Sequence, residues 1–129
     1  MKLLFLLLGL SSAAQATIIE PCSVSIPSTR IIYEGYVIEF GDAIRTIIEK
    51  KGYHVTFDES EAESILRIES RFVEGGFLNK AQVSWIFNGA SHSNLKSCLT
   101  QLCSIYDFRS ALITSLKSMD KKIPACSSN

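Results

Sequence analysis

Histidine and cysteine, the residue types with the widest catalytic and metal-binding use, are few in this sequence. It contains two histidines, His54 and His92, and four cysteines. A zinc site would need His92 together with Cys98 and Cys103, but this spacing matches no common zinc arrangement, and oxidised thiols do not ligate. No G-x-S-x-G elbow for a nucleophilic serine occurs. We expect both histidines to be solvated, His54 on the outward face of a strand and His92 in a polar loop.

Acidic residues are more numerous, with 13 Asp and Glu in total. The carboxylate pairs of glycosidases are defined by their separation in space, so the sequence alone does not reveal them. The run 58–63 holds four acidic residues but lacks the glycine of a calcium-binding loop, and we interpret it as a solvated turn. No phosphate-binding loop or dinucleotide fingerprint occurs. The sequence therefore predicts no catalytic residue, no cofactor and no metal site, and we expect a protein that is not an enzyme.

The four cysteines, Cys22, Cys98, Cys103 and Cys126, instead predict two disulfides in an exported domain. Cys98 and Cys103 can pair only in an irregular segment, because five residues along a strand separate two side chains by roughly 16 Å. In that case Cys22–Cys126 would tie the ends of the domain together. If the segment is a strand, Cys98–Cys126 with Cys22–Cys103 becomes more plausible. We favour the first pairing.

Export is predicted by residues 1–16, which have the pattern of a signal peptide. A lysine precedes an apolar run over 3–10, and the small-x-small triplet at 14–16 predicts cleavage before Thr17. The apolar run is about half of the roughly 20 residues that span a bilayer. Cys22 lies too far from the predicted cut to be a lipidation site. We expect a periplasmic or extracellular protein without a lipid anchor or membrane insertion.

Residues 17–129 have the length of a single domain. The full chain balances 13 basic against 13 acidic residues, and no basic stripe is present. A surface of this kind does not favour nucleic acid or anionic lipid. The sequence leaves the oligomeric state open.

The region from Phe40 to Glu69 organises the predicted fold. Apolar residues recur at helical spacing up to Ile48, Asp42 can act as the N-cap, and Gly52 can end the helix. A strand with Tyr53, Val55 and Phe57 on its inner face follows the helix. After the acidic turn, 64–73 forms a longer strand.

The flanking regions supply the remaining elements. Residues 17–28 are interpreted as irregular, and 30–33 as a short strand that forms a βαβ crossover with the first helix and the strand after it. The glycines of 74–80 indicate a hairpin loop before a strand over 82–88. No element is assigned over 90–103. A second amphipathic helix starts near Ser104, with Asp107 completing a capping box, and ends before Pro124.

Together these elements predict an α+β domain. We expect a single sheet of about four strands with two amphipathic helices packed on one face, in the order β-α-β-β-β-α, stapled by disulfides. The predicted core comprises Ile44, Ile48, Val55, Leu66, Ile68, Trp85, Leu112 and Leu116.

Two short runs resemble a known kind of domain. Gly52-Tyr53-x-Val55 followed by Glu61-Ala62-Glu63-x-Ile65-Leu66-Arg67-Ile68 is similar to small α+β domains of Gram-negative envelope proteins. Examples are the amino-terminal domain of the Tol-system periplasmic protein and the lipoproteins of the curli-secretion type. Many members carry a lipidated cysteine beside the signal sequence, and this chain departs from that pattern. The resemblance implies an assembly or binding role in the envelope, with another envelope protein as partner, and carries over no catalytic residue.

The predicted hairpin loop offers a candidate contact with that partner. It places Phe77 and Leu78 beside two glycines, between strands whose apolar faces are already supplied. An aromatic side chain at a loop tip can anchor a partner, although Phe77 could instead fold back to cap the core. We therefore expect a non-enzymatic binding or assembly-accessory module. The alternative is a secreted inhibitor or effector that acts on another organism's protein.

Overall fold

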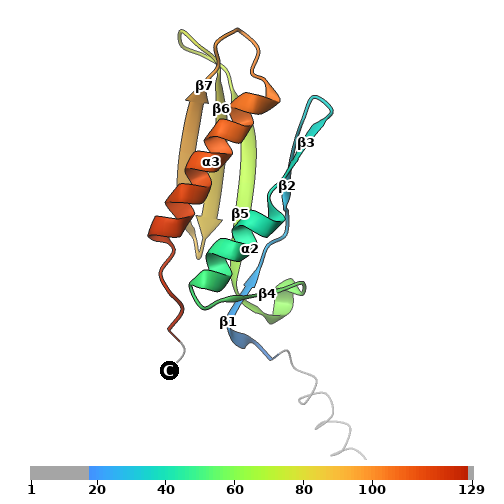
Figure 1. Ribbon diagram of the computed structural model, residues 1–129, viewed down its shortest axis with the longest axis vertical. Helices are drawn as coiled ribbons and strands as arrows, with labels where there is room; N and C mark the ends of the chain where they lie inside the picture. Colours follow the sequence, from blue (N-terminus) through green and yellow to red (C-terminus); the bar gives the residue numbers. More distant parts are fainter. Residues whose placement is uncertain (1–17, 128–129) are drawn as a thin grey trace, which may run out of the picture.

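The computed structural model describes residues 18–127. The predicted signal peptide and its cleavage site lie outside the described residues. The class is α+β, with helices α2 and α3 on one face of the main sheet (Figure 1). Among the described residues, no helix combines the length and apolar character that a membrane span requires. The elements are β1 (Glu20–Ser25), β2 (Arg30–Tyr33), β3 (Tyr36–Glu39), α2 (Gly41–Lys50), β4 (His54–Thr56), a 3-10 turn η1 (Glu59–Glu61), β5 (Ala62–Val73), β6 (Lys80–Phe87), β7 (Ala90–Ser97) and α3 (Ile105–Lys122).

The main sheet has five strands in the order β4-β1-β5-β6-β7, not about four in the predicted order. Strand β1 runs parallel to β4 and β5, and β5, β6 and β7 are antiparallel. The predicted crossover is therefore wrong in its first strand. It is β1, in the segment interpreted as irregular, that lies beside β4, whereas β2 pairs only with β3. The strand was not predicted because its segment contains two prolines and several serines, which are typical of irregular chain. In the structure, Ser23 and Ser25 of this strand are buried.

The β2–β3 hairpin turns at Glu34 and Gly35. Their φ angles of 49° and 82° are both positive, as a two-residue hairpin turn of the primed type requires. The sequence analysis instead interpreted these residues as a connection between the strand at 30–33 and the first helix. Tyr33 at the end of β2 packs on Phe108 of α3, with ring centroids 4.5 Å apart. The hairpin thus packs against the helix layer and is not part of the main sheet.

The structure confirms the predicted C-terminal end of α2 at Gly52 but not the predicted N-cap, Asp42. The N-cap is Phe40, with no side-chain hydrogen bond, and Asp42 lies inside the first turn. At the other end Gly52 has φ +92°. Its N–H donates to the carbonyl of Glu49 (3.0 Å), and the Tyr53 N–H donates to that of Ile48 (3.1 Å). These are the two bonds of a Schellman motif.

Replacing Gly52 by alanine should lower the free energy of unfolding by about 1–2 kcal/mol. The cause is the positive φ, because an added Cβ would lie 3.8 Å from the nearest atoms of Cys126, an ordinary contact. Urea denaturation measures the loss. Gly52→Asn is the matched control and should lose less, because asparagine tolerates the left-handed region. Equal losses in the two variants would contradict this explanation.

Strands β5 and β6 bury the residues that alternation predicted. Leu66 and Ile68 of β5 face the helices, opposite Phe87 and Trp85 of β6. Strand β4 is shorter than predicted and leaves Phe57 beyond it, 94% exposed. Strand β7 was not predicted because it is a polar edge strand with little apolar alternation.

The core lies between this sheet and the two helices. Of the eight predicted core residues, Val55 and Leu116 are partly buried and the other six are buried. Helix α3 begins with the expected cap, since the Asp107 carboxylate accepts a hydrogen bond from the Ser104 N–H at 2.8 Å. The disulfides are Cys22–Cys126 and Cys98–Cys103, which confirms the favoured pairing. The segment between Cys98 and Cys103 is irregular, as that pairing requires.

Candidate functional site

Four large apolar side chains gather at the end of the molecule where β5, β6 and β7 meet the start of α3. Phe77 is 99% exposed, Leu99 93%, Leu102 69% and Leu78 36%. Phe77 and Leu78 come from the β5–β6 loop, and the two other leucines from the loop between β7 and α3. The two loops stand side by side at the top of Figure 1. We call these four residues the apolar tip.

The β5–β6 loop has the conformation that its glycines allow. Gly75 and Gly76 have φ angles of 125° and 68°, which side-chain-bearing residues rarely adopt. The chain therefore turns sharply after β5 and directs Phe77 into solvent. Phe77 is presented to solvent rather than folded back over the core. Its role in binding stays a prediction.

The second loop is closed by the Cys98–Cys103 disulfide, whose sulfurs are buried under it. Leu99 and Leu102 lie just inside the two cysteines and point away from the core. Within the loop, the Thr100 hydroxyl donates to the carbonyl of Leu102 at 2.6 Å and accepts from its N–H at 3.3 Å. A covalent closure and local hydrogen bonds thus fix the positions of both leucines.

Asn79 joins the two loops. Its carbonyl accepts from the N–H of Cys98 at 2.9 Å, and its side-chain amide donates to the carbonyl of Gln101. A groove of about 750 Å³ runs between the loops, with Phe72 among its lining residues. The two loops that carry the apolar tip are therefore connected through Asn79, and a disulfide closes one of them. Because neither loop can move freely without the other, a partner would meet a largely preformed site.

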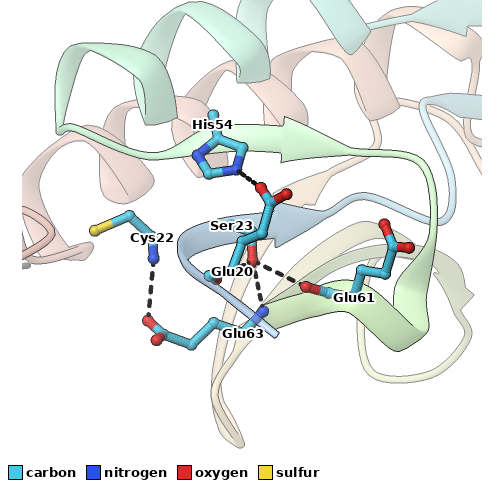
Figure 2. Close-up of polar contacts among 6 residues, drawn as sticks. All are labelled: Glu20, Cys22, Ser23, His54, Glu61 and Glu63. Atoms are coloured by element: carbon cyan, nitrogen blue, oxygen red, sulfur yellow. Dashed lines mark hydrogen bonds and ion pairs between the residues drawn. The ribbon is translucent and has the colours of Figure 1, made fainter. Parts of the chain in front are cut away.

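A serine, a histidine and a glutamate also lie close together at the opposite end, but they do not form a hydrolytic triad. His54 Nε2 lies 2.8 Å from the Glu20 carboxylate (Figure 2). The Ser23 hydroxyl is buried and engaged with the backbone, since it accepts from the Glu63 N–H at 2.8 Å and donates to the carbonyl of Glu20 at 2.5 Å. His54 is exposed, as expected, and its ring contacts the Glu20 carboxylate at the surface.

Ser23 instead bridges an irregular stretch of the β1–β5 pairing. The register between β1 and β5 shifts between Glu20 and Val24, and Cys22 in this stretch has φ 60°. The Ser23 hydroxyl takes the place of a ladder hydrogen bond there, and the Cys22 N–H contacts the Glu63 carboxylate at 3.4 Å (Figure 2). Cys22, the residue that carries the long-range disulfide, therefore lies in this irregular stretch.

The other candidate chemical groups also have structural surroundings. His92 lies in β7 rather than in a loop, and its half-buried ring stacks on Trp85 with centroids 4.3 Å apart, so the expectation of a solvated side chain is wrong. Cys98, Cys103 and Asp107 have their ligand atoms within 4.8 Å of one another. The two sulfurs are bonded to each other and cannot ligate a metal as thiolates. The Asp107 carboxylate already accepts from Ser104.

Comparison of the chain with protein families, with curated proteins and with solved structures finds no match. A functional assignment therefore depends on the surface of the molecule. Sequence reasoning found Phe77 and Leu78 but missed Leu99 and Leu102. The sequence did contain an indication of these two leucines, because each is the direct neighbour of a cysteine in the predicted Cys98–Cys103 loop.

Proposed function

We propose that this protein is an exported, non-enzymatic binding or assembly-accessory module of the bacterial cell envelope, and that the apolar tip is its contact with a partner protein. The observation that carries the proposal is the exposure of four large apolar side chains on two connected loops. Contiguous exposed apolar surface on a small protein is typical of interaction sites.

The construction of the tip favours binding to a partner. Aromatic side chains are prominent among the residues that dominate binding energy, and Phe77 is the most exposed large apolar residue of the tip. Ordering loops upon association costs free energy, and loops that are already fixed reduce that cost. Asn79 and the Cys98–Cys103 disulfide provide this fixing.

The disulfides support an exported location. Both bonds join cysteines of one small domain, and such bonds form and persist in oxidising compartments such as the periplasm or the extracellular medium. A disulfide-closed loop that presents Leu99 and Leu102 would equally suit an inhibitor that fills a cleft of another protein. The source of the captured partner separates these functions, because an inhibitor or effector would bind a protein of another organism.

Phe77→Ala should weaken binding by 1 kcal/mol or more, the rough threshold for an interface residue that matters. Its free energy of unfolding should change by less than about 0.5 kcal/mol, as for other exposed sites. The measurement uses cross-linking capture of the mature protein with its own envelope fraction, mass spectrometry to identify the partner, and titration of that purified partner. Thermal unfolding is followed in parallel.

Phe57→Ala is the matched control, because Phe57 is also an almost fully exposed phenylalanine but follows β4, far from the tip. It should leave the affinity unchanged. Leu99→Ala should behave like Phe77→Ala, since both side chains belong to the tip. Equal affinities of Phe77→Ala and the unmodified protein would remove the tip as the binding site.

A further inference from the structure

Strand β7 forms one edge of the five-stranded sheet and pairs only with β6. The N–H of Cys98, directly after the strand, donates to the carbonyl of Asn79 at 2.9 Å, so the even-numbered residues of β7 direct their backbone groups toward β6. The N–H and C=O groups of the odd-numbered residues, from Ser91 to Ser97, therefore point away from the sheet. In the described part of the chain no strand pairs with them.

This edge carries few of the features by which proteins keep an exposed strand from pairing with another chain. Such features are prolines, bulges and rows of charged side chains. Strand β7 has no proline, its pairing with β6 is continuous over all eight residues, and Lys96 is its only Lys, Arg, Asp or Glu. A second strand can therefore approach along the whole of β7.

Helix α3 lies above the gap between β6 and β7. The Ser115 hydroxyl donates to the carbonyl of Val83 in β6 at 3.3 Å and accepts from the side-chain amide of Asn94 in β7 at 2.8 Å. Neighbouring strands are about 4.8 Å apart, so in a sheet formed by two paired copies of β7 the midpoints of the two α3 helices would be about 10 Å apart. Helices that pack against each other have this separation.

The side of α3 that would face the second copy has small residues between two opposite charges. Asp120 contacts Lys50 of α2 at 3.8 Å and marks the side of α3 that is turned toward α2. With 3.6 residues per turn, the opposite side lies toward the outer edge of the sheet, where Figure 1 shows the C-terminal end of α3 beside β7. The residues on this side are Asp107, Ala111, Thr114, Ser118 and Lys122.

Asp107 and Lys122 complement each other in an antiparallel pair of α3 helices. They lie about 12 Å and about 10.5 Å from Ser115 along the helix axis, on either side of it, at 1.5 Å per residue. A twofold axis beside Ser115 and Asn94 would therefore bring Asp107 of each copy next to Lys122 of the other. Asp107 uses only its Oδ2 for its two bonds to Ser104, and neither Asp107 nor Lys122 forms an ion pair within the described chain.

We propose that β7 binds a second copy of this chain, in a twofold-symmetric dimer whose two sheets join through antiparallel β7–β7 pairing. In this register the outward backbone groups of the two strands meet each other. Asn94 lies opposite Asn94 of the second copy, and Lys96 lies opposite His92 and not opposite itself. The two α3 helices pack side by side, with their small residues at the centre and an Asp107–Lys122 ion pair at each end.

A second copy fits this edge better than a strand of another protein does. A single added strand would satisfy the backbone groups of β7 but would leave the facing side of α3 uncovered, whereas a second copy covers both. The dimer does not depend on the function proposed for the apolar tip. Because the twofold axis reverses the second copy, the two tips lie at opposite ends of the joined sheet.

Ser93→Pro tests the strand pairing, because proline removes the outward N–H near the centre of the edge and leaves the bonds between β7 and β6 in place. Sedimentation velocity of the mature, disulfide-bonded protein from about 1 μM to about 1 mM should show a dimer, with a dissociation constant at least about tenfold higher for Ser93→Pro. Ser93→Ala is the matched control. It loses the same hydroxyl, which lies 2.8 Å from that of Ser84, but keeps the N–H and should dimerise like the unmodified protein.

Lys122→Glu tests the helix contact without changing the strand. Each dimer contains two Asp107–Lys122 contacts, and both become contacts between like charges, so the dissociation constant should rise about tenfold at low salt. Lys117→Glu makes the same charge change at an exposed position on the outward side of α3 and should leave the dissociation constant unchanged.

Hydrogen exchange locates the interface, because dimerisation at higher protein concentration should slow exchange at the alternate amides of 91–97. A protein that stays monomeric over the whole concentration range would overturn the proposal and would leave the edge to a strand of another protein. A dimer that Ser93→Pro leaves intact, or that Lys122→Glu weakens no more than Lys117→Glu does, would overturn it as well. So would a dimer that Phe77→Ala abolishes, since the apolar tip would then be the interface.

Discussion

Removing the Cys22–Cys126 disulfide by the double change to alanine should lower the free energy of unfolding by about 5 kcal/mol. The bond joins cysteines that are 104 residues apart, and so it constrains almost the whole described chain in the unfolded state. The Cys98–Cys103 bond closes a separation of only 5 residues, and its loss should cost about 2 kcal/mol on the same chain-entropy argument. Urea denaturation of the two double variants measures both losses.

The most specific part of this prediction is that loss of the Cys22–Cys126 bond lowers the free energy of unfolding more than loss of the Cys98–Cys103 bond. Both variants replace two disulfide-bonded cysteines by alanine, so differences in side-chain chemistry largely cancel. A larger loss for the short bond would mean that strain or residual structure in the unfolded chain outweighs loop entropy. The short bond should matter more for binding, because it fixes Leu99 and Leu102 in the apolar tip.

Truncation of Leu66 to alanine should cost about 2–5 kcal/mol, and Leu112→Ala a loss in the same range. Leu66 is fully buried in β5 opposite Phe87, and Leu112 is buried on α3. Each change removes apolar contacts and leaves a cavity that rigid neighbours fill only in part. Chemical denaturation with a check for an unchanged m-value gives the loss.

Leu95→Ala is the matched control for these truncations, because Leu95 is an exposed leucine on the edge strand β7. Its loss should stay within about 0.5 kcal/mol, as at other surface sites. A loss below about 1 kcal/mol at both buried sites would show that the core packs more loosely than the burial indicates.

The parts of the fold that sequence reasoning found are those with strong periodicity. The stripe of α3, the alternation of β5 and β6, and the Gly52 helix stop all follow from local physical rules. The strands that it missed are β1, β3 and β7. Strand β3 has only four residues, and β1 and β7 bury serines or face solvent with polar side chains. Their place in the sheet depends on neighbours that are distant in the sequence, so no local pattern reveals it.

In the candidate site, too, the features that follow from local sequence were predicted and those that depend on tertiary contacts were not. The glycines around Phe77 indicated an exposed loop, and the structure presents that residue to solvent. That Leu99 and Leu102 stand beside it depends on the β5–β6 and β6–β7 hairpins, which bring Asn79 next to Cys98. Strand β5 pairs with β1 up to Ile65 and with β6 from Leu66 on, and this is also a tertiary feature, because it depends on where β1 leaves the sheet.

The Cys22–Cys126 bond also decides how the domain responds to a mechanical load. It joins the first strand to the chain after α3, at the end of the molecule away from the apolar tip (Figure 1). A pulling force applied through both ends of the described chain would pass through this covalent link and bypass the sheet and both helices. The domain should then extend only by the few residues outside the bond, as single-molecule stretching can measure. While tethered in this way, the domain would keep the apolar tip folded under load.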